Sequence, residues 1–333
     1  MSIINNFLNK RYSTRNLTDA EFDGILPVLA EELSTVNFIP SYTEQELRKD
    51  WVNLCAWNSS GNRINSTSRI GMKLCEHFFP NFWDIEDNRG NSFRKLWGDP
   101  KFLEKVIRWN RNSHSTPYLS ELRRGVYFCS RLCKSTMYRP QMSKLVTKDA
   151  KRILDPCMGW GGRLLGAIAS GAEYVGFDPN TETYSHLNEL VDFLGVQSKV
   201  RLICDDALNM NDYGIGNFDV VLTSPPYFDL EIYCKESTQS VSNTSNYAQW
   251  NEKFLNPLIE KCVSHLNPNG KSCWNVAKVG TNDMWESVRT AHQDLGFTVV
   301  DEYEVCSSAR QVHQTKTKNK KSVDRTVVYA KAN

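Results

Sequence analysis

A glycine-rich turn between a short apolar segment and a helical pattern constrains the fold of this 333-residue chain most strongly. The segment 152–155 is apolar and ends in Asp155, and Gly159, Gly161 and Gly162 follow before a helix rich in small residues. Glycines there permit a backbone path that side chains would block, and they let a ligand lie against the chain. The order of strand, glycine turn and helix predicts the first unit of a parallel α/β sheet.

The same turn limits the class of ligand. It lacks the Lys-Ser/Thr ending of a phosphate-cradling loop, so we do not expect a nucleoside triphosphate. Asp155 would repel a pyrophosphate and suits a cationic or amine-bearing ligand instead.

Two further predicted strands also end in acids. The segment 173–179 contains Asp178, and the segment 199–207 contains Asp205 and Asp206. An acid at the end of the second strand is placed to accept hydrogen bonds from ribose hydroxyls. Because the carboxyl ends of parallel strands meet at one edge, where ligands of open α/β sheets bind, we expect these acids to share a site.

A fourth predicted strand, 218–223, ends in the tetrapeptide Ser224-Pro225-Pro226-Tyr227. Its apolar, β-branched run is typical of a buried strand, and two prolines cannot continue a hydrogen-bonded ladder. A hydroxyl, backbone carbonyls and an aromatic ring at a strand end form a preformed recess. The alternative is a Pro-Pro turn that only ends the strand. The polar stretch 237–247 that follows predicts either a lid or a surface loop.

Together these segments resemble the S-adenosylmethionine-dependent amino-methyltransferases of nucleic acid, which methylate adenine N6 or cytosine N4. The resemblance covers residues 138–332 and implies a Rossmann-like class I methyltransferase sheet with a C-terminal antiparallel strand pair. It implies S-adenosylmethionine as the cofactor and no metal. The residues that it assigns to cofactor binding are Asp155, Pro156, Gly159, Gly161, Asp178, Asp206 and Thr223.

The resemblance also implies a role for each part of the site. The glycine turn wraps the methionine end of the cofactor, Asp178 holds the ribose, and Asp206 meets the adenine amino group better than Asp205 does. The tetrapeptide is catalytic: Ser224 and the Pro225 carbonyl would accept hydrogen bonds from the target amine.

The tetrapeptide also bears on the target base. Pro226 belongs to its rigid turn, and Tyr227 would stack on a base that has left the duplex. The Ser-Pro-Pro-Tyr form is seen most often in cytosine-N4 enzymes, which favours cytosine N4 over adenine N6.

The amino-terminal part differs in character from the rest. We expect residues 1–140 to form a mostly helical target-recognition domain and residues 141–333 to form the methyltransferase domain. The segment 94–148 carries thirteen Lys or Arg against three acids, interleaved with aromatic residues, which is typical of a nucleic-acid face. Arg123 and Arg124 are candidates within it. The alternative is a structural cap on the sheet.

A second basic segment lies between the last two predicted strands, 297–305 and 326–330, which we expect to pair antiparallel. A basic loop there suits contact with a phosphate backbone, whereas solvated lysines on a hairpin are the alternative. Its candidate nucleic-acid-binding residues are Arg310, Lys316, Lys318, Lys320 and Lys321.

These observations predict a site-specific DNA methyltransferase that modifies a flipped-out base. The alternatives are an RNA base amino-methyltransferase, a protein-glutamine methyltransferase, whose family uses a similar Asn-Pro-Pro-Tyr, or a catalytically dead nucleic-acid-binding module. DNA is the expected partner, and a nuclease of a restriction-modification system is possible. The ten cysteines form no Cys-x-x-Cys pair, and no segment resembles a signal peptide or a membrane span, so we expect a cytoplasmic or nucleoid-associated protein.

Overall fold

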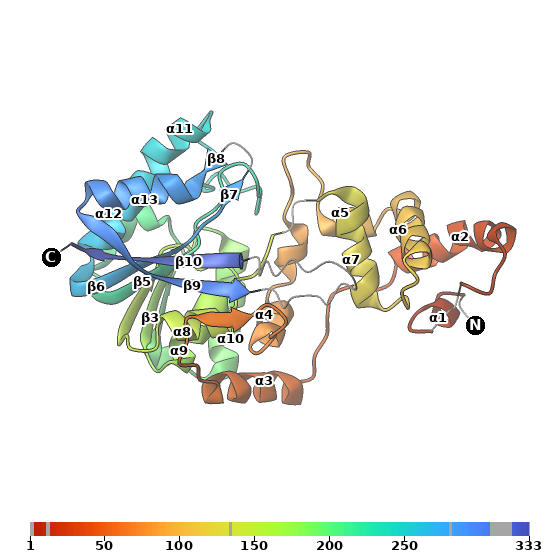
Figure 1. The fold of residues 1–333 in the computed structure, drawn as a ribbon, viewed down its shortest axis with the longest axis horizontal. Coiled ribbons are helices and arrows are strands. Elements are labelled where there is room, and N and C mark those ends of the chain that lie inside the picture. The colour runs from red at the N-terminus through yellow and green to blue at the C-terminus, as the bar shows by residue number, and fades with distance from the viewer. Residues whose placement is uncertain (1–2, 11–13, 133–134, 280–281, 307–321, 333) are drawn as a thin grey trace, which may run out of the picture. The chain divides into compact units, whose positions relative to one another are not determined.

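The structure, a computed structural model, describes residues 3–10, 14–132, 135–279, 282–306 and 322–332 (Figure 1). The chain forms two compact units. The first, here called the helical unit, comprises Met1–Pro40, Pro80–Thr136 and Asp229–Lys235. The second, here called the sheet unit, comprises Ser41–Phe79, Met137–Phe228 and Glu236–Asn333.

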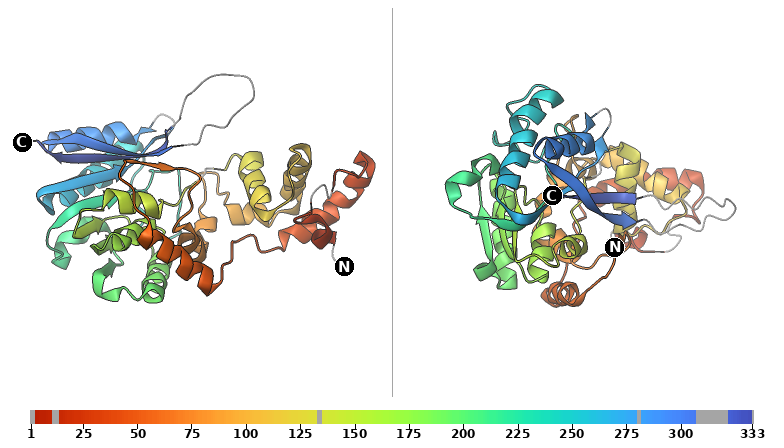
Figure 2. Two further views of the ribbon diagram at one scale, coloured as in Figure 1. Left: turned by 60° about the horizontal axis from the view of Figure 1, so that its bottom comes forward. Right: turned by 60° about the vertical axis from the view of Figure 1, so that its left-hand side comes forward.

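The sheet unit contains an eight-stranded sheet in the order β1-β9-β10-β6-β5-β2-β3-β4. The strands β2 to β6 run parallel, and β10 lies antiparallel between β6 and β9. This topology confirms the predicted α/β class with its C-terminal antiparallel pair, which Figure 2 shows from two sides. The strands are β1 (Arg63–Asn65), β2 (Arg152–Asp155), β3 (Glu173–Phe177), β4 (Val200–Ile203), β5 (Phe218–Thr223), β6 (Leu266–Asn275), β9 (Phe297–Cys306) and β10 (Ser322–Lys331), with a separate short pair β7 (Lys278–Val279) and β8 (Asn282–Asp283).

Helices cover both faces of this sheet, with α12 and α13 on one side and α8, α9 and α10 on the other (Figure 1). Alternate residues of the strands face the α12 side, where Leu154, Val221 and Trp274 join Ile259 and Val288 in one buried core. The helices of the unit are α3 (Glu44–Ala56), α4 (Met72–Phe78), α8 (Pro140–Val146), α9 (Gly162–Ala169), α10 (Thr181–Leu194), α11 (Tyr247–Trp250), α12 (Asn256–Ser264) and α13 (Met284–Asp294); a π-helical turn, Asn251–Leu255, joins α11 to α12, and short 3₁₀ turns span Gln197–Lys199 and Ala207–Tyr213.

Two glycines of α9 let α8 pack directly against it. A Cβ atom on Gly162 would lie 1.9 Å from the Tyr138 carbonyl oxygen, and one on Gly166 would lie 2.3 Å from the Pro140 carbonyl oxygen. Both obstacles are backbone atoms, so neither can move aside cheaply. Glycine is therefore required here to bring the helix after the glycine turn close to the segment that precedes β2.

The sheet unit also includes the segment Ser41–Phe79, so the compact units do not divide at residue 140. Within it, β1 pairs with β9 in parallel. The buried Lys144 ammonium donates hydrogen bonds of 2.7 to 3.0 Å to three carbonyls at the end of α3, those of Leu54, Cys55 and Trp57. These contacts satisfy carbonyls that a helix end leaves without partners.

The helical unit is built around its own core, which includes Phe22, Leu29, Trp97, Leu103 and Val126. A capping box opens α2, where the Thr18 hydroxyl accepts from the Glu21 amide and Glu21 accepts from the Thr18 amide; α3 of the sheet unit begins in the same way. In the segment Asp229–Lys235, Ile232 exchanges two backbone hydrogen bonds with Glu86. The helices are α1 (Ile3–Phe7), α2 (Asp19–Ser34), α5 (Phe93–Trp97), α6 (Pro100–Asn112) and α7 (Leu119–Ser130), with a 3₁₀ turn at Pro80–Asp84.

The cysteines and the length of the helices can be stated for the described residues. The nine cysteines within them are free thiols. None of the helices described combines the length and apolar character that crossing a bilayer requires.

Candidate active site

The glycine turn and the tetrapeptide begin at adjacent points of the sheet. β2 and β5 are neighbours, with Ile153 paired to Val220, although two strands separate them in sequence. From β2 the strand order runs through β3 and β4 to one edge, whereas β5 and β6 lie on the other side. In open α/β sheets ligands bind at the carboxyl ends of the strands at such a reversal. The turn after Asp155 and the tetrapeptide from Ser224 both start there.

Left-handed backbone shapes the glycine turn. Gly159 has φ 53° and Gly161 has φ 71°, a region that favours glycine. A Cβ atom on Gly161 would also meet Leu190 and Phe79 at 2.9 Å. The Gly159 amide donates a 2.9 Å hydrogen bond to Asp178 Oδ2, which fastens the turn to the end of β3.

Asp155 is fully buried beneath the turn. Its Oδ2 accepts 2.7 Å hydrogen bonds from Arg163 Nε and from the Tyr174 hydroxyl, and its Oδ1 accepts one from the Cys157 amide. Arg163 also donates to the Cys157 carbonyl, so one guanidinium ties β2 to the turn. The sequence predicts that Asp155 faces a ligand, whereas in the structure its carboxylate is fully buried. Because its carboxylate pairs with the buried Arg163, we expect Asp155 to hold the backbone of the glycine turn in place instead of contacting the ligand.

Asp178 follows β3 and bridges the turn to the start of α10. Besides the Gly159 amide, it accepts a 3.0 Å hydrogen bond from the Asn180 amide at Oδ1. Burial raises the pKa of Asp178 to about 6, although both amides favour the charged form. Its charge therefore changes close to neutral pH.

The two acids after β4 have different surroundings. Both Asp205 oxygens accept hydrogen bonds from Asn209, and Oδ2 accepts another of 2.7 Å from the Tyr213 hydroxyl. Asp206 caps the following 3₁₀ turn through Oδ1, whereas its Oδ2 accepts no hydrogen bond from any described residue. Burial raises the pKa of Asp206. The free oxygen supports the preference for Asp206 over Asp205 as the ligand-facing acid.

Thr223, the last residue of β5, is fully buried. Its Oγ1 is shielded from solvent and has no hydrogen-bond partner in the described part of the chain. Such a group costs about 1 to 3 kcal/mol relative to a paired one. A bound molecule that hydrogen-bonds to Thr223 Oγ1 would remove this cost. The predicted site residues Pro156 and Pro225 are also buried.

Ser224 contacts a residue that the sequence did not single out. Its Oγ lies 3.5 Å from Oδ1 of Asn275, the last residue of the neighbouring strand β6. Asn275 Nδ2 donates to Asp324 Oδ1 at 2.6 Å and to the Arg325 carbonyl at 3.0 Å. Since the nitrogen side is engaged, the oxygen of the amide faces Ser224. A polar residue directly after the apolar pair Cys273-Trp274 was the available signal.

The residue after the tetrapeptide is strained. Phe228 has φ 45°, which is unusual for a bulky residue and costs on the order of 1 to 3 kcal/mol. Its ring lies 5.9 Å from that of Tyr247 and 6.0 Å from that of Trp250, so α11 holds it. Strain of this kind clusters at functional sites. Pro226 and Tyr227, just before it, are half-buried.

The polar stretch after the tetrapeptide is anchored near its amino-terminal end, at Ser240 and at the preceding Glu236. Ser240 Oγ accepts a 3.0 Å hydrogen bond from Trp250 Nε1 in α11. Glu236 Oε1 accepts one of 2.5 Å from Thr181 Oγ1, at the start of α10 and three residues from Asp178. The stretch therefore reaches the same edge of the sheet as the strand-end acids, and its use as a lid stays a prediction.

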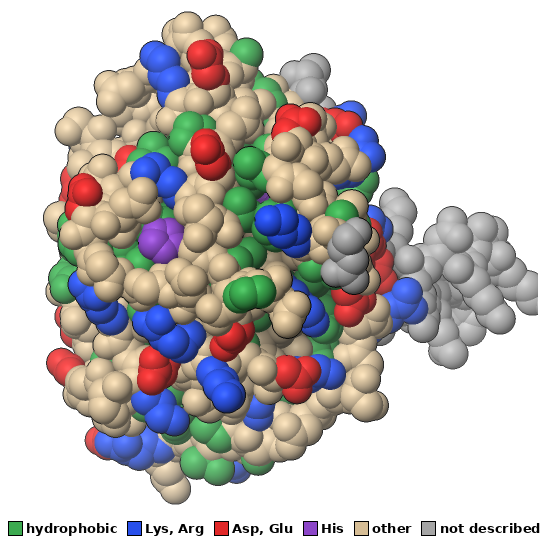
Figure 3. Space-filling model, turned by 90° about the vertical axis from the view of Figure 1, so that its left-hand side faces the viewer, with side chains coloured by type: hydrophobic (Ala, Val, Ile, Leu, Met, Phe, Trp, Pro, Cys, Tyr) green, Lys and Arg blue, Asp and Glu red, His purple; other side chains and the backbone are tan. Residues whose placement is uncertain are grey.

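The predicted nucleic-acid-binding residues fall into two groups. Arg310, Lys316, Lys318, Lys320 and Lys321 lie outside the described residues. In the helical unit, half-buried Arg123 donates to the Phe38 carbonyl at 2.7 Å, whereas Arg124 is exposed and pairs with Glu121. On the face drawn in Figure 3, basic and acidic side chains are interspersed, so neither sign forms a continuous field there.

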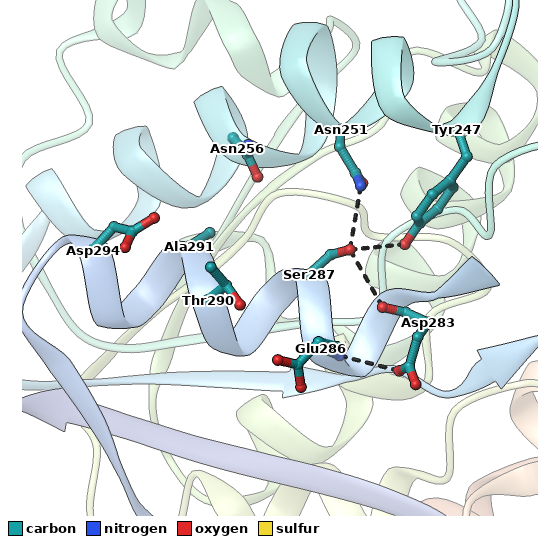
Figure 4. Close-up of a pocket in the computed structure, with 9 residues that line it drawn as sticks. All are labelled: Tyr247, Asn251, Asn256, Asp283, Glu286, Ser287, Thr290, Ala291 and Asp294. Carbon is teal, nitrogen blue, oxygen red and sulfur yellow. Dashed lines mark hydrogen bonds between the residues drawn. The ribbon is translucent and has the colours of Figure 1, made fainter. Parts of the chain in front are cut away.

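A pocket of about 400 Å³ lies between α13 and the helix that contains the π-helical turn (Figure 4). Ser287 is its centre: the hydroxyl lies 3.1 Å from the Tyr247 hydroxyl, accepts from Asn251 Nδ2 and donates to the Asp283 carbonyl. None of the predicted site residues lines it. Within the described ranges, no cluster of three or more His, Cys, Asp or Glu could hold a metal ion.

Comparisons with known proteins identify no family for this chain. No protein-family model and no curated protein matches the sequence. Solved structures with a similar fold include TrmN from Thermus thermophilus, with 17% identity and a TM-score of 0.41 over 58% of this chain and 49% of that one.

Two other neighbours have similar scores. They are a putative rRNA methylase from Clostridium thermocellum (15% identity, TM-score 0.40, 60% of this chain and 100% of that one) and an S-adenosylmethionine-dependent O-methyltransferase from Thermotoga maritima (14%, 0.41, 60% and 68%). At these identities and scores the likenesses do not identify an activity, and the sheet topology alone establishes the fold class.

Proposed function

We propose that this protein transfers a methyl group from S-adenosylmethionine to an exocyclic amine of a nucleic-acid base. One observation carries the proposal: the glycine turn after β2 and Ser-Pro-Pro-Tyr after β5 flank the reversal of strand order. The next two strands, β3 and β4, are each followed by acids at the same edge, Asp178 after β3 and Asp205 and Asp206 after β4. A Pro-Pro turn that merely ended β5 would require neither the glycine turn after β2 nor the acids after β3 and β4.

The residues present fit the cofactor. Asp178 offers a carboxylate to ribose hydroxyls, Asp206 has a free oxygen for an amino group, and buried Thr223 Oγ1 lacks a partner. Gly159 and Gly161 keep the turn free of side chains where the methionine end would lie. When bound, S-adenosylmethionine supplies an electrophilic methyl group on a positively charged sulfur.

The tetrapeptide acts on the other reactant. An exocyclic amine is a poor nucleophile because its lone pair is delocalised into the aromatic base. Hydrogen bonds from the amine to Ser224 Oγ and to the Pro225 carbonyl draw the nitrogen toward sp³ geometry and direct its lone pair. The nitrogen–methyl bond forms as the sulfur–methyl bond breaks, and the amine then loses a proton to water. Positioning and electrostatics supply the acceleration.

Asn275 sets the direction of the serine hydroxyl. Because Asn275 Oδ1 accepts the Ser224 proton, the lone pairs of Ser224 Oγ are left for the target amine. Tyr227 stacks on the base after it has left the helix. We expect DNA as the substrate, with cytosine N4 ahead of adenine N6, and an RNA base or a protein glutamine as the alternatives. The amino-terminal 140 residues are our candidate for target recognition.

The test is methyl transfer from labelled S-adenosylmethionine to mixed-sequence DNA, RNA and protein, followed by nucleoside mass spectrometry. N4-methylcytosine or N6-methyladenine in DNA, absent with Ser224→Ala protein, is the expected result. Label in RNA or protein would move the substrate to an alternative. Cofactor binding with no label in any polymer would contradict the enzymatic proposal and favour a nucleic-acid-binding module.

A further inference from the structure

The aromatic rings of the helical unit differ widely in exposure, and Tyr118 (51%) as well as Phe128 lies at the surface. Phe128 in α7 is 69% exposed, whereas Trp97 and Phe102, which belong to the same basic and aromatic segment, are 1% and 8% exposed. The interleaved aromatics predicted from sequence therefore divide into core residues and a surface group. A single exposed apolar side chain is ordinary, so the role of Phe128 depends on what lies around it.

Phe128 belongs to a layered group of three side chains across α6 and α7. Its ring centroid lies 5.3 Å from that of Trp109 in α6, with 34° between the ring planes. The Arg124 guanidinium carbon lies 5.3 Å from the Trp109 ring centroid. Since Arg124 and Phe128 are four residues apart, they share one face of α7. We call Arg124, Trp109 and Phe128 the aromatic platform.

A glycine holds this arrangement in place. A Cβ atom on Gly125 would lie 2.9 Å from Trp109 Cε3 and 2.9 Å from Val106 Cγ1. The indole of Trp109 therefore lies directly on the α7 backbone, in contact with both Arg124 and Phe128. A supported indole limits the freedom of the exposed ring, which lowers the entropic cost of stacking a further ring on it.

The charge around the platform is positive. α6 and α7 together carry six Lys or Arg and two Glu. Arg111 and Arg123 donate to carbonyls within the unit, and Arg108 pairs with Asp23. Lys105 is exposed and lies one helical turn from Trp109. Arg124, which also pairs with Glu121, lies over the Trp109 ring, so it and Lys105 are the cations of the platform's surroundings.

We infer that the aromatic platform stacks an unpaired base of a nucleic acid whose phosphates lie near Lys105 and Arg124. Base–aromatic stacking combined with cations is the usual means of binding single strands, and it requires a π-face instead of a shaped apolar groove. The inference rests on the proposed function for its biological setting. It concerns binding, however, and can fail or succeed independently of methyl transfer.

The test measures the affinity of the full chain for a labelled mixed-sequence single-stranded oligonucleotide by fluorescence anisotropy at fixed salt. Phe128→Ala and Phe128→Leu are each expected to weaken binding about tenfold, because stacking contributes about 1 to 3 kcal/mol per base. Phe128→Tyr, which keeps the π-face, should bind within about twofold of wild type. Val28→Ala removes another exposed side chain of the helical unit, 54% exposed, and should have no effect.

Salt dependence separates the electrostatic contribution of Lys105 from stacking on the platform. Lys105→Ala should reduce the slope of log affinity against log salt by about one, whereas Phe128→Ala should leave the slope unchanged. If the Phe128→Ala protein bound the oligonucleotide with wild-type affinity, the inference would be overturned. The proposal of methyl transfer would not be affected by that result. Full affinity in Phe128→Leu would also overturn it, since an aliphatic contact would then suffice. A self-association that Phe128→Ala abolishes, without any change in oligonucleotide affinity, would show a protein-docking surface instead.

Discussion

Asn275 Oδ1 lies 3.5 Å from Ser224 Oγ, across the ends of the neighbouring strands β6 and β5. The Asn275 amide cannot turn over without losing its hydrogen bonds to Asp324 and to the Arg325 carbonyl. Its oxygen is therefore held toward the serine, and the serine proton is held toward Asn275. Asn275 positions Ser224 in this account and does not itself touch the substrate.

Removing this positioning residue should slow methyl transfer without affecting the cofactor. We expect Asn275→Ala to lower the rate at saturating cofactor about tenfold, the equivalent of one hydrogen bond of about 1.4 kcal/mol, with an unchanged Kd for S-adenosylmethionine. Asn267→Ala is the matched control, because Asn267 makes a 2.8 Å amide–carboxylate hydrogen bond with Asp219 at the opposite end of β6. The same rate loss in both variants would assign Asn275 a merely structural role.

The charge of Asp178 should make cofactor affinity depend on pH. Ribose hydroxyls donate to the carboxylate, so protonation of Asp178, whose pKa burial raises to about 6, removes the acceptor. We expect the Kd for S-adenosylmethionine, measured by calorimetry, to be flat above this pKa and to rise about tenfold per pH unit below it. Asp178→Asn should bind weakly at every pH.

Asp205→Asn is the control for this profile. Hydrogen bonding from Tyr213 lowers the pKa of Asp205, so its charge does not change in the same range. This variant should keep the wild-type dependence on pH. A flat profile in the wild type, or a wild-type profile in Asp178→Asn, would contradict the ribose role.

Tyr227 should matter through its ring. Tyr227→Ala is expected to lower methyl transfer by at least about a hundredfold, with cofactor affinity little changed, because the flipped base loses its stacking surface. Tyr227→Phe keeps the ring and should retain most of the rate. Single-turnover measurements at saturating cofactor distinguish the two, and equal losses in both variants would point to the hydroxyl instead.

Two glycine substitutions should have opposite effects on stability. Gly166→Ala places a methyl group 2.3 Å from the Pro140 carbonyl oxygen, so we expect the free energy of unfolding to fall by about 1 to 3 kcal/mol or more. Gly24→Ala, inside α2 with nothing within 4 Å, should raise it by about 0.5 to 1 kcal/mol. Urea unfolding followed by circular dichroism measures both. A stable Gly166→Ala protein would mean that α8 and α9 do not pack this closely.

The sequence predicted those parts of the fold that local patterns determine. Apolar runs that end in acids or prolines located β2, β3, β4 and β5, and the C-terminal pair was confirmed as antiparallel. The pairing of β1 with β9 was not predicted, because partners such as Arg63 and Glu304 lie far apart in the chain and neither segment encodes the other. The compact units mix distant segments for the same reason.

In the candidate site, too, local features could be predicted from the sequence and contacts between distant segments could not. Residue types at strand ends could be read from the sequence, and Asp178, Asp206 and Ser224 do follow the carboxyl ends of parallel strands in one sheet. The partners of those residues could not be predicted: Arg163 neutralises Asp155 from the following helix, and Asn275 meets Ser224 only because β6 lies beside β5. Such contacts depend on packing, which no local pattern specifies.

The most direct test of the account compares wild-type and Ser224→Ala protein in single-turnover methyl transfer, with both saturated with labelled S-adenosylmethionine and given the polymer that the wild type methylates. The account predicts equal cofactor affinity and a rate lower by at least about a hundredfold in the variant. Equal rates would contradict it, because the hydroxyl at the end of β5 would then take no part in activating the amine.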